Sequence, residues 1–283
     1  MSRAVLIGVL GLLAISLPAA GARAPAVPSF GHVVVVVLEN KAKRDVLGNR
    51  AAPYFNALAA RSAVFTRYGG LVHPSLPNYL ALVSGSTHGI RSDCTACVVS
   101  AENLADTLEQ SSLTWKAYAE GLPWPGFTGA RAGRYVKRHV PFLYFRNIVR
   151  SPSRRRQVVP LRQLSRDLAA GQLPSFSLVV PDACHDMHDC PVAVGDRWLR
   201  RTLPPILRSL TDGVLFVVTD EPPFSSPPRA PVPAIAAGPL VKPGSRYGMP
   251  LSHFALLRTI EDAWSLRRLG RSARAVPISG IWK

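Results

Sequence analysis

Three apolar stretches of this sequence each end in acidic residues. Glu39, with Asn40 beside it, ends FGHVVVVVLEN; Asp182 follows SFSLVVP; Asp220 and Glu221 follow GVLFVVT. Carboxylates crowded together repel one another or take up protons unless a cation compensates them. If the three stretches meet in the fold, their acids predict a site for a divalent metal ion.

The same stretches predict how the acids are brought together. Residues 30–40, 175–181 and 213–219 are rich in β-branched and apolar side chains, which is typical of strands buried on both faces of a parallel α/β sheet. Ligands of open α/β sheets bind beyond the carboxyl ends of the strands. One acidic strand end is equally well explained as the start of a polar loop, but three together favour a site.

Ser75 is the candidate nucleophile. Pro74 and Pro77 bracket it in a rigid turn before an apolar helix that ends at Gly85. A helix N-terminus offers free amide donors and a positive dipole, so a hydroxyl there is well placed to meet a phosphate. The alternative is that Ser75 only caps the helix.

Four cysteines divide into two close pairs. Their spacing pairs Cys94 with Cys97 and Cys184 with Cys190, as expected of disulfides in an exported protein. A zinc site built from the four thiolates and cross-pairing are the alternatives.

The first residues resemble a secretory signal peptide. Arg3 precedes an apolar run at 4–17, and Ala22-Arg23-Ala24 forms a small-residue cleavage site, so residues 1–24 are predicted to be removed. The apolar run is shorter than the ~20 residues that a membrane span needs. We therefore expect a secreted protein without stable membrane insertion, with residues 25–283 forming one domain; a retained N-terminal anchor is the minority alternative.

The chain is strongly basic, with a formal net charge of +17. This favours anionic partners such as a phosphate-bearing substrate or an acidic cell envelope, although an arginine-biased genome explains it equally well. The densest cluster, SPSRRRQ at 151–157, has no interleaved aromatic residues and is predicted to be a solvated loop, not a nucleic-acid site.

The remaining patterns alternate between helix and strand. Tyr135–Phe145 places Lys137, Arg138 and His139 among aromatic residues, as an anion clamp or simply a basic edge. Further helices are predicted at 51–60, 104–110, 161–170, 193–210 and 252–264, and further strands at 63–66, 114–118 and 232–237.

Five motifs in order resemble a known family. HVVVVVLEN, HPSLPNYLALVSGSTHGI, PDACHDMHDC, VVTDE and SHFALLRTIEDAW, spanning residues 31–265, are similar to the phosphoesterase family of secreted bacterial and fungal acid phosphatases and phospholipases C, within the alkaline phosphatase superfamily. The resemblance implies an alkaline-phosphatase-like fold, in which helices sandwich a central, mostly parallel sheet. It also implies hydrolysis of phosphoric esters.

The resemblance also implies roles for individual residues. Ser75 would be the nucleophile, and a divalent metal ion would be bound by Glu39, Asn40, Ser75, Asp220 and Glu221. Phosphate contact is expected from Asn78, His73, Lys137 and His139; leaving-group protonation from His185 or His188; and a second metal would use Asp182, Asp186 and His253. Two-metal relatives carry a histidine four residues after an aspartate, whereas here Asp186 occupies that place after Asp182.

The predicted function is an acid phosphatase that acts on phosphomonoesters, with a phosphorylated small molecule or a phospholipid as substrate. A phospholipase C-type phosphodiesterase is the alternative, disfavoured because the short chain carries no added lipid-binding domain. A sulfatase is disfavoured because Leu76-Pro77 follows Ser75 in place of the Cys/Ser-x-Pro-x-Arg motif. A non-catalytic binder of acidic envelope polymers would explain the charge but not the acidic strand ends.

Overall fold

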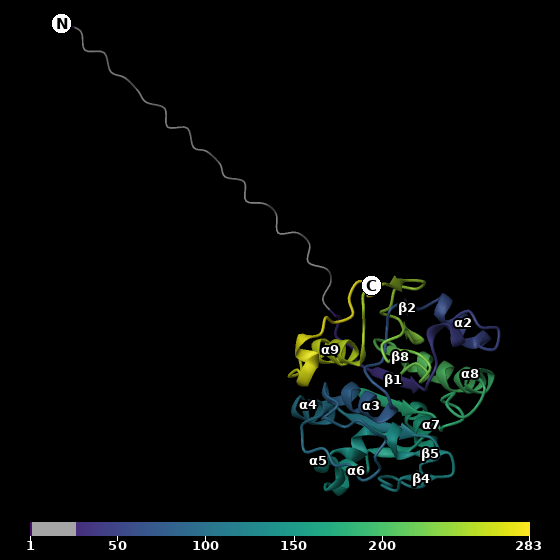
Figure 1. The fold of residues 1–283 in the computed structure, drawn as a ribbon. Coiled ribbons are helices and arrows are strands. Elements are labelled where there is room, and N and C mark those ends of the chain that lie inside the picture. Colours follow the sequence, from purple (N-terminus) through teal and green to yellow (C-terminus); the bar gives the residue numbers. More distant parts are fainter. Residues whose placement is uncertain (2–26) are drawn as a thin grey trace.

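The valine-rich strand β1 (Val33–Leu38) lies near the middle of an eight-stranded sheet with the order β10-β2-β9-β8-β1-β7-β3-β6. The computed structural model describes residue 1 and residues 27–283 (Figure 1). All six residues of β1 are buried. Their side chains alternate between two cores: Val33, Val35 and Val37 face one, whereas Val34, Val36 and Leu38 face the other.

The sheet is mostly parallel. β1 pairs in parallel with β7 and β8, and β3 with β6 and β7, whereas β9 runs antiparallel to β8 and β2. The other strands of the sheet are β2 (Ala63–Phe65), β3 (Trp115–Ala119), β6 (Val158–Pro160), β7 (Phe176–Val180), β8 (Val214–Thr219), β9 (Ala234–Ala237) and β10 (Arg246–Tyr247). A separate ribbon joins β4 (Arg131–Ala132) to β5 (Tyr135–Val136).

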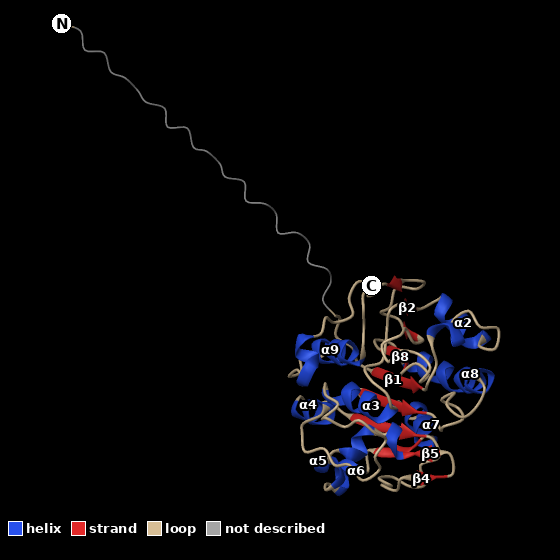
Figure 2. Cartoon of the chain, in the orientation of Figure 1, coloured by secondary structure: helices blue, strands red, loops and turns tan. Residues whose placement is uncertain are grey.

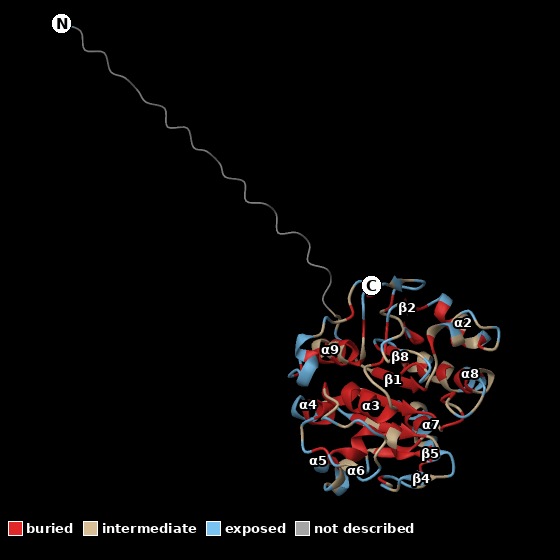
Figure 3. Cartoon of the chain, in the orientation of Figure 1, coloured by how far each residue is buried: buried red, intermediate tan, exposed pale blue. Residues whose placement is uncertain are grey.

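Helices cover both faces of the sheet (Figure 2). One face carries α3 (Ser75–Ser84), α4 (Leu104–Gln110) and α9 (His253–Ala263), and the other carries α2 (Pro53–Ala60), α7 (Arg162–Ala169) and α8 (Val192–Ser209). Shorter pieces are α1 (Lys43–Val46), α5 (Arg146–Val149), α6 (Pro152–Arg155) and the 3₁₀ turns η1 (Lys137–His139), η2 (Pro141–Tyr144) and η3 (Gly270–Arg274). Every residue of α3 is buried, unlike those of the other five helices that cover the sheet (Figure 3).

The predicted fold class, a single α/β domain with a mostly parallel sheet sandwiched by helices, is confirmed. Some boundaries differ. The helix predicted from residue 51 begins at Pro53, because proline suits the first helical position. The strand predicted from Val232 begins at Ala234, since Pro233 has no amide for the ladder and the Val232 amide donates to Tyr68 instead.

Two disulfides join Cys94 to Cys97 and Cys184 to Cys190, the pairs favoured by their spacing. No cysteine is left free for a thiolate zinc site. Among the helices of the described residues, none has both the length and the apolar character to cross a membrane. The predicted signal peptide lies outside the described residues.

Candidate active site

The acidic residues after β1 and β8 leave the sheet at the same edge. The register pairs Leu38 with Thr219, so Glu39 and Asp220 each follow one residue beyond a paired position. The Asn40 amide donates a hydrogen bond to Asp220 Oδ1 at 3.2 Å, which ties the two strand ends together. The predicted convergence is therefore present for the acidic ends of β1 and β8, whereas Asp182 groups with Glu120 and His185.

Ser75 faces these carboxylates. It is the first residue of α3, and the capping position belongs to Pro74, so the alternative that Ser75 only caps the helix is wrong. Its Oγ donates to Glu39 Oε2 at 2.9 Å and lies 3.4 Å from Glu221 Oε1. Ser75 is buried, and its hydroxyl lies between two carboxylates at the start of a helix.

The carboxyl groups around Ser75 resist ionisation. Burial raises the pKa of Glu39, Asp220 and Glu221, and the neighbouring acids raise it further; the pKa of Glu221 reaches about 8. Such a cluster binds protons at neutral pH unless a cation is present to compensate the charge.

Several oxygens at this edge have no partner within the described residues. Glu39 Oε1, Asn40 Oδ1 and Asp220 Oδ2 are buried without a hydrogen bond. Buried polar atoms are rarely left unpaired, because desolvation then costs about 1–3 kcal/mol each. Two carboxylates and an amide oxygen are ligands that suit a hard or borderline divalent cation. Asn40 also adopts φ 48°, a conformation that non-glycine residues seldom adopt outside sites and turns. The residues present therefore fit a metal ion.

Two of the residues predicted to contact phosphate lie within hydrogen-bond distance of Glu221. Nδ1 of His73 lies 2.8 Å from Glu221 Oε2, and its Nε2 lies 3.1 Å from the Ser226 carbonyl oxygen. Asn78 Nδ2 donates to the Val72 carbonyl at 2.7 Å and to Glu221 Oε2 at 3.2 Å. The Asn78 Oδ1 accepts from the Leu71 amide at 2.8 Å. Both side chains thus fix the turn before α3 and orient Glu221.

His139 lies behind Glu39. Its Nε2 is 3.5 Å from Glu39 Oε2, and its Nδ1 is 3.2 Å from Asp186 Oδ2. Burial lowers the pKa of His139 to about 4 and raises that of Asp186 to about 7. The ring of Tyr79 stacks on His139 at a centroid distance of 5.2 Å. Burial thus favours the neutral form of the His139 imidazole, which packs against the candidate metal site.

His253, predicted to bind a second metal, and Lys137, predicted to contact phosphate, both form hydrogen bonds with other parts of the chain. His253 Nε2 lies 2.6 Å from the Asp220 carbonyl oxygen and its Nδ1 lies 2.9 Å from the Tyr68 hydroxyl, so neither ring nitrogen is free for a second metal. Lys137 Nζ donates to the Thr95 carbonyl at 2.9 Å, where it holds the Cys94–Cys97 loop. These contacts make both residues structural supports of the site.

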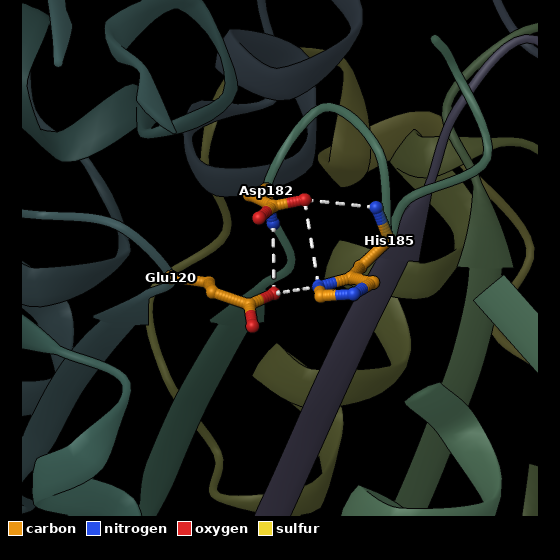
Figure 4. Close-up of side chains that lie close together, drawn as sticks. All are labelled: Glu120, Asp182 and His185. Atoms are coloured by element: carbon orange, nitrogen blue, oxygen red, sulfur yellow. Dashed lines mark hydrogen bonds and ion pairs between the residues drawn. The ribbon is translucent and has the colours of Figure 1, made fainter. Parts of the chain in front are cut away.

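A second group of potential ligands lies at the ends of β3 and β7. One atom from each of Glu120, Asp182 and His185 lies within 4.8 Å of the others, a spacing that could hold a metal ion (Figure 4). His185 Nδ1 is 2.9 Å from Glu120 Oε2, which also accepts from the Asp182 amide at 3.1 Å. The Asp182 Oδ1 accepts from the amides of Cys184 and His185. The potential ligand atoms of this group therefore already have hydrogen-bond partners, whereas Glu39 Oε1 and Asp220 Oδ2 have none among the described residues.

The histidines of the Cys184–Cys190 loop point in different directions. His188 lies near the site, with its ring 6.4 Å from that of His139 and its Nδ1 2.6 Å from Asp189 Oδ1. His185 turns towards Glu120 and the Trp198 ring. Of the two predicted leaving-group acids, the geometry favours His188.

Two residues that contribute to the site, Glu120 and Asp93, were not predicted from the sequence. Glu120 directly follows β3, so the rule applied to Glu39 would have found it. Asp93 accepts from the Leu76 amide at 2.9 Å and lies 3.4 Å from Arg138 Nε. Asp93 lies in a loop, and no strand or helix pattern points to it.

Comparison with known proteins identifies the family. Residues 45–267 match the family model described as the phosphoesterase family. The chain belongs to the phosphoesterase family. Its members hydrolyse phosphoric esters, so the chain is an enzyme of that class and not a passive binder of envelope polymers.

Relatives of this phosphoesterase carry phosphatase names. A phosphatidylinositol-3-phosphatase from Mycobacterium tuberculosis is 37% identical over 98% of this chain and 93% of its own length. An acid phosphatase from Aspergillus fumigatus is 26% identical over 86% of this chain, which spans 57% of the fungal protein.

Solved structures confirm the fold. A protein of the alkaline phosphatase superfamily from Vibrio parahaemolyticus has a TM-score of 0.58 at 14% identity, covering 90% of this chain and 72% of its own. A phosphonate monoester hydrolase from Agrobacterium radiobacter also reaches 0.58, at 13% identity over 84% of this chain and 74% of its own.

Proposed function

We propose that this phosphoesterase is a metal-dependent phosphomonoesterase that uses Ser75 as its nucleophile. The observation that carries the proposal is the hydrogen bond from Ser75 Oγ to Glu39 Oε2, formed at the start of α3 and beside unpartnered carboxylate oxygens. A serine placed in this way has both a proton acceptor and an electropositive helix end at hand.

Glu39, Asn40, Asp220 and Glu221 would hold the divalent cation. When bound, the ion would lower the pKa of the Ser75 hydroxyl and neutralise negative charge on the phosphate. The unpartnered oxygens of Glu39, Asn40 and Asp220 support this assignment over the Glu120 cluster, whose ligand atoms already have partners.

The chain's own residues then supply two displacements. Glu39 Oε2 accepts the Ser75 proton as Oγ bonds to phosphorus, and the ester oxygen departs with a proton from His188, which gives a phosphoserine and a free alcohol. Water next attacks phosphorus and gives a proton to His188, while Ser75 Oγ leaves and recovers its proton from Glu39, so inorganic phosphate is released and both groups are restored. His73 and Asn78 keep Glu221 in place throughout, because each lies within hydrogen-bond distance of its Oε2.

The names of the relatives support a monoester substrate, either a soluble phosphate ester or a phosphoinositide. A phospholipase C-type diesterase stays the alternative. We also propose that the protein is exported. The two disulfides support export, as does the predicted signal peptide.

The test is hydrolysis of p-nitrophenyl phosphate by wild type, Ser75→Ala and Ser84→Ala. Ser84 is a matched control, because it is a buried serine of the same helix whose hydroxyl bonds to the Leu80 carbonyl. We expect Ser75→Ala to lose activity by at least about a thousandfold while staying folded, since loss of a nucleophile removes the covalent route. Activity above about a tenth of wild type in Ser75→Ala would contradict the role.

A further inference from the structure

Arg138 is a basic residue of the active-site region to which the proposed mechanism gives no role. It belongs to η1, between Lys137 and His139. The Lys137 ammonium donates to a backbone carbonyl, and the His139 ring lies behind Glu39. Of these three consecutive basic residues, Arg138 is therefore the one whose charged group is not already bound within the site or its supports.

The fold uses only part of the Arg138 guanidinium. Its Nε lies 3.4 Å from Asp93 Oδ2, as an ion pair, and is buried without a hydrogen bond. The side chain is 21% exposed, and its two terminal nitrogens form no hydrogen bond with another described residue. Since an arginine carries five N–H donors in a planar fork, most of these donors are free to bind an anion.

Asp93 connects this guanidinium to the residue that follows the nucleophile. Its Oδ1 accepts from the Leu76 amide at 2.9 Å, while its Oδ2 faces Arg138 Nε. One carboxylate thus bridges Arg138 and the first turn of α3, the helix end that carries Ser75. The Asp93 carboxylate is itself an anion, so Arg138 is directed at a place beside Ser75 where an anion is bound.

A second set of contacts brings the η1 turn close to Ser75. Arg138 directly precedes His139, whose Nε2 lies 3.5 Å from Glu39 Oε2. The same Glu39 oxygen accepts from the Ser75 hydroxyl at 2.9 Å. The His139 ring also lies 6.4 Å from the ring of His188, the proposed leaving-group acid. The turn that carries Arg138 therefore lies on the side of Ser75 where His188 is found.

A phosphate ester bound at Ser75 meets more negative charge than one divalent ion offsets. Burial, followed by the charges of Glu39 and Asp93, raises the pKa of Glu221, and Asp220 adds a further carboxyl group. The ester itself brings about two negative charges near neutral pH. A guanidinium binds phosphate oxygens in pairs and stabilises the charge of a phosphoryl group in transfer, so an arginine is suited to this place.

We propose that Arg138 binds the non-bridging oxygens of the phosphoryl group through its terminal nitrogens, and that Asp93 competes with the phosphate for the same guanidinium. The proposal rests on the proposed function, since it needs the phosphoryl group to be bound at Ser75. Arg138 is then the residue of the 137–139 run that acts as an anion clamp, whereas Lys137 only supports the fold.

The experiment measures how inorganic phosphate inhibits hydrolysis of p-nitrophenyl phosphate by wild type, Arg138→Gln and Asp93→Asn. We expect Arg138→Gln to raise the inhibition constant of phosphate by about ten- to a hundredfold, the effect of losing charged hydrogen bonds, and to lower kcat/KM at least as much. Asp93→Asn keeps an oxygen for the Leu76 amide but removes the competing charge, so its inhibition constant should equal that of wild type or fall below it.

The matched control is Arg131→Gln, at an exposed arginine of the neighbouring strand β4. It should leave the inhibition constant within about twofold of wild type, because solvent and salt screen an exposed charge. An equal rise in Arg131→Gln and Arg138→Gln would mean that only the general positive field matters, and the assignment of Arg138 would be refuted.

Two further outcomes would also refute the assignment. If Asp93→Asn raises the inhibition constant as much as Arg138→Gln does, the ion pair between them only holds the loop. If Arg138→Gln loses bound metal by elemental analysis, Arg138 acts through the metal site and does not contact phosphate.

Arg138→Lys covers the case in which Arg138→Gln does not fold. Lysine keeps the positive charge beside Asp93 but lacks the paired donors, so the inhibition constant should rise by about threefold or more. A value equal to that of wild type would refute the paired contact. Wild type that hydrolyses no monoester would instead overturn the proposed function and this assignment with it, whereas active wild type with unchanged inhibition in Arg138→Gln would overturn the assignment alone.

Discussion

Glu39 and Asp220 leave adjacent parallel strands at the same level, and each keeps one buried carboxylate oxygen without a hydrogen-bond partner among the described residues. Both side chains are almost fully buried. The charge of Glu39 raises the pKa of Asp220 beyond the effect of burial. In the absence of a cation this pair is a source of instability, and its relief by metal binding is measurable.

The first prediction concerns Asp220→Asn. The change removes ligand charge, so we expect less bound metal per protein, loss of phosphatase activity, and loss of the metal-dependent rise in melting temperature. The metal-free variant should be at least as stable as metal-free wild type, because one buried acid is gone. Elemental analysis and thermal unfolding with and without EDTA provide the measurements.

Asp212→Asn serves as the control, because Asp212 is an exposed acid beyond α8. Its stability should stay within about 0.5 kcal/mol of wild type, with metal content unchanged. Wild-type enzyme that is stripped of divalent ions and keeps full activity would refute the metal assignment.

The central sheet and its acidic edge could be predicted because their signals are local. A run such as Val33–Leu38 is too apolar for a surface strand, and a carboxylate directly after it must emerge at the strand end. The same reasoning placed Asp220 and Glu221 correctly beside Glu39.

Other side chains could not be placed from the sequence, because their partners come from distant segments. His253 bonds to Tyr68 and to the Asp220 carbonyl, at sequence separations of 185 and 33 residues. Nothing near position 253 reveals either contact. The antiparallel strand β9 likewise depends on how its loop returns to the sheet, which a pattern of six apolar residues does not encode.

The second prediction concerns Asn78, which the sequence assigned to phosphate and the structure uses to hold the turn before α3. We expect Asn78→Ala to lower the free energy of unfolding by about 1–3 kcal/mol, because the Leu71 amide loses its acceptor and Glu221 loses a donor. Urea unfolding monitored by tryptophan fluorescence would measure the loss.

Asn78→Asp provides the matched variant. It keeps an acceptor for Leu71 but places a new carboxylate against Glu221, so it should also be destabilised at neutral pH. If both variants match wild type in stability and differ only in KM, Asn78 contacts phosphate and does not hold the turn.

The third prediction concerns Glu120. Because its Oε2 accepts from the Asp182 amide and lies 2.9 Å from His185 Nδ1, Glu120→Ala should loosen the Cys184–Cys190 loop and reduce kcat severalfold through His188. Glu120→Gln retains an acceptor oxygen and should restore most of the activity. Metal content should stay at the wild-type value in both variants. A fall of one equivalent in Glu120→Gln would instead identify the Glu120, Asp182 and His185 group as a metal site.

The last prediction uses Glu261, a buried acid of α9 that lies outside the candidate site. Its Oε1 accepts from the Leu269 amide at 2.8 Å and its Oε2 from Ser272 Oγ at 2.6 Å. Burial nevertheless raises the pKa of Glu261 to about 7, from 4.5 in an exposed glutamate. Between these values the folded protein binds a proton that the unfolded chain has released, so stability falls as pH rises through this range.

Glu261→Gln is neutral at every pH and keeps an acceptor for Leu269. We therefore expect the stability lost between pH 5 and pH 8 to be smaller in Glu261→Gln than in wild type by about 2–3 kcal/mol, measured by urea unfolding. Glu102→Gln, at an exposed glutamate paired with Arg267, should leave the pH dependence as it is in wild type. Equal pH slopes for wild type and Glu261→Gln would mean that Glu261 stays ionised in the folded protein, with its two hydrogen bonds outweighing the cost of burial.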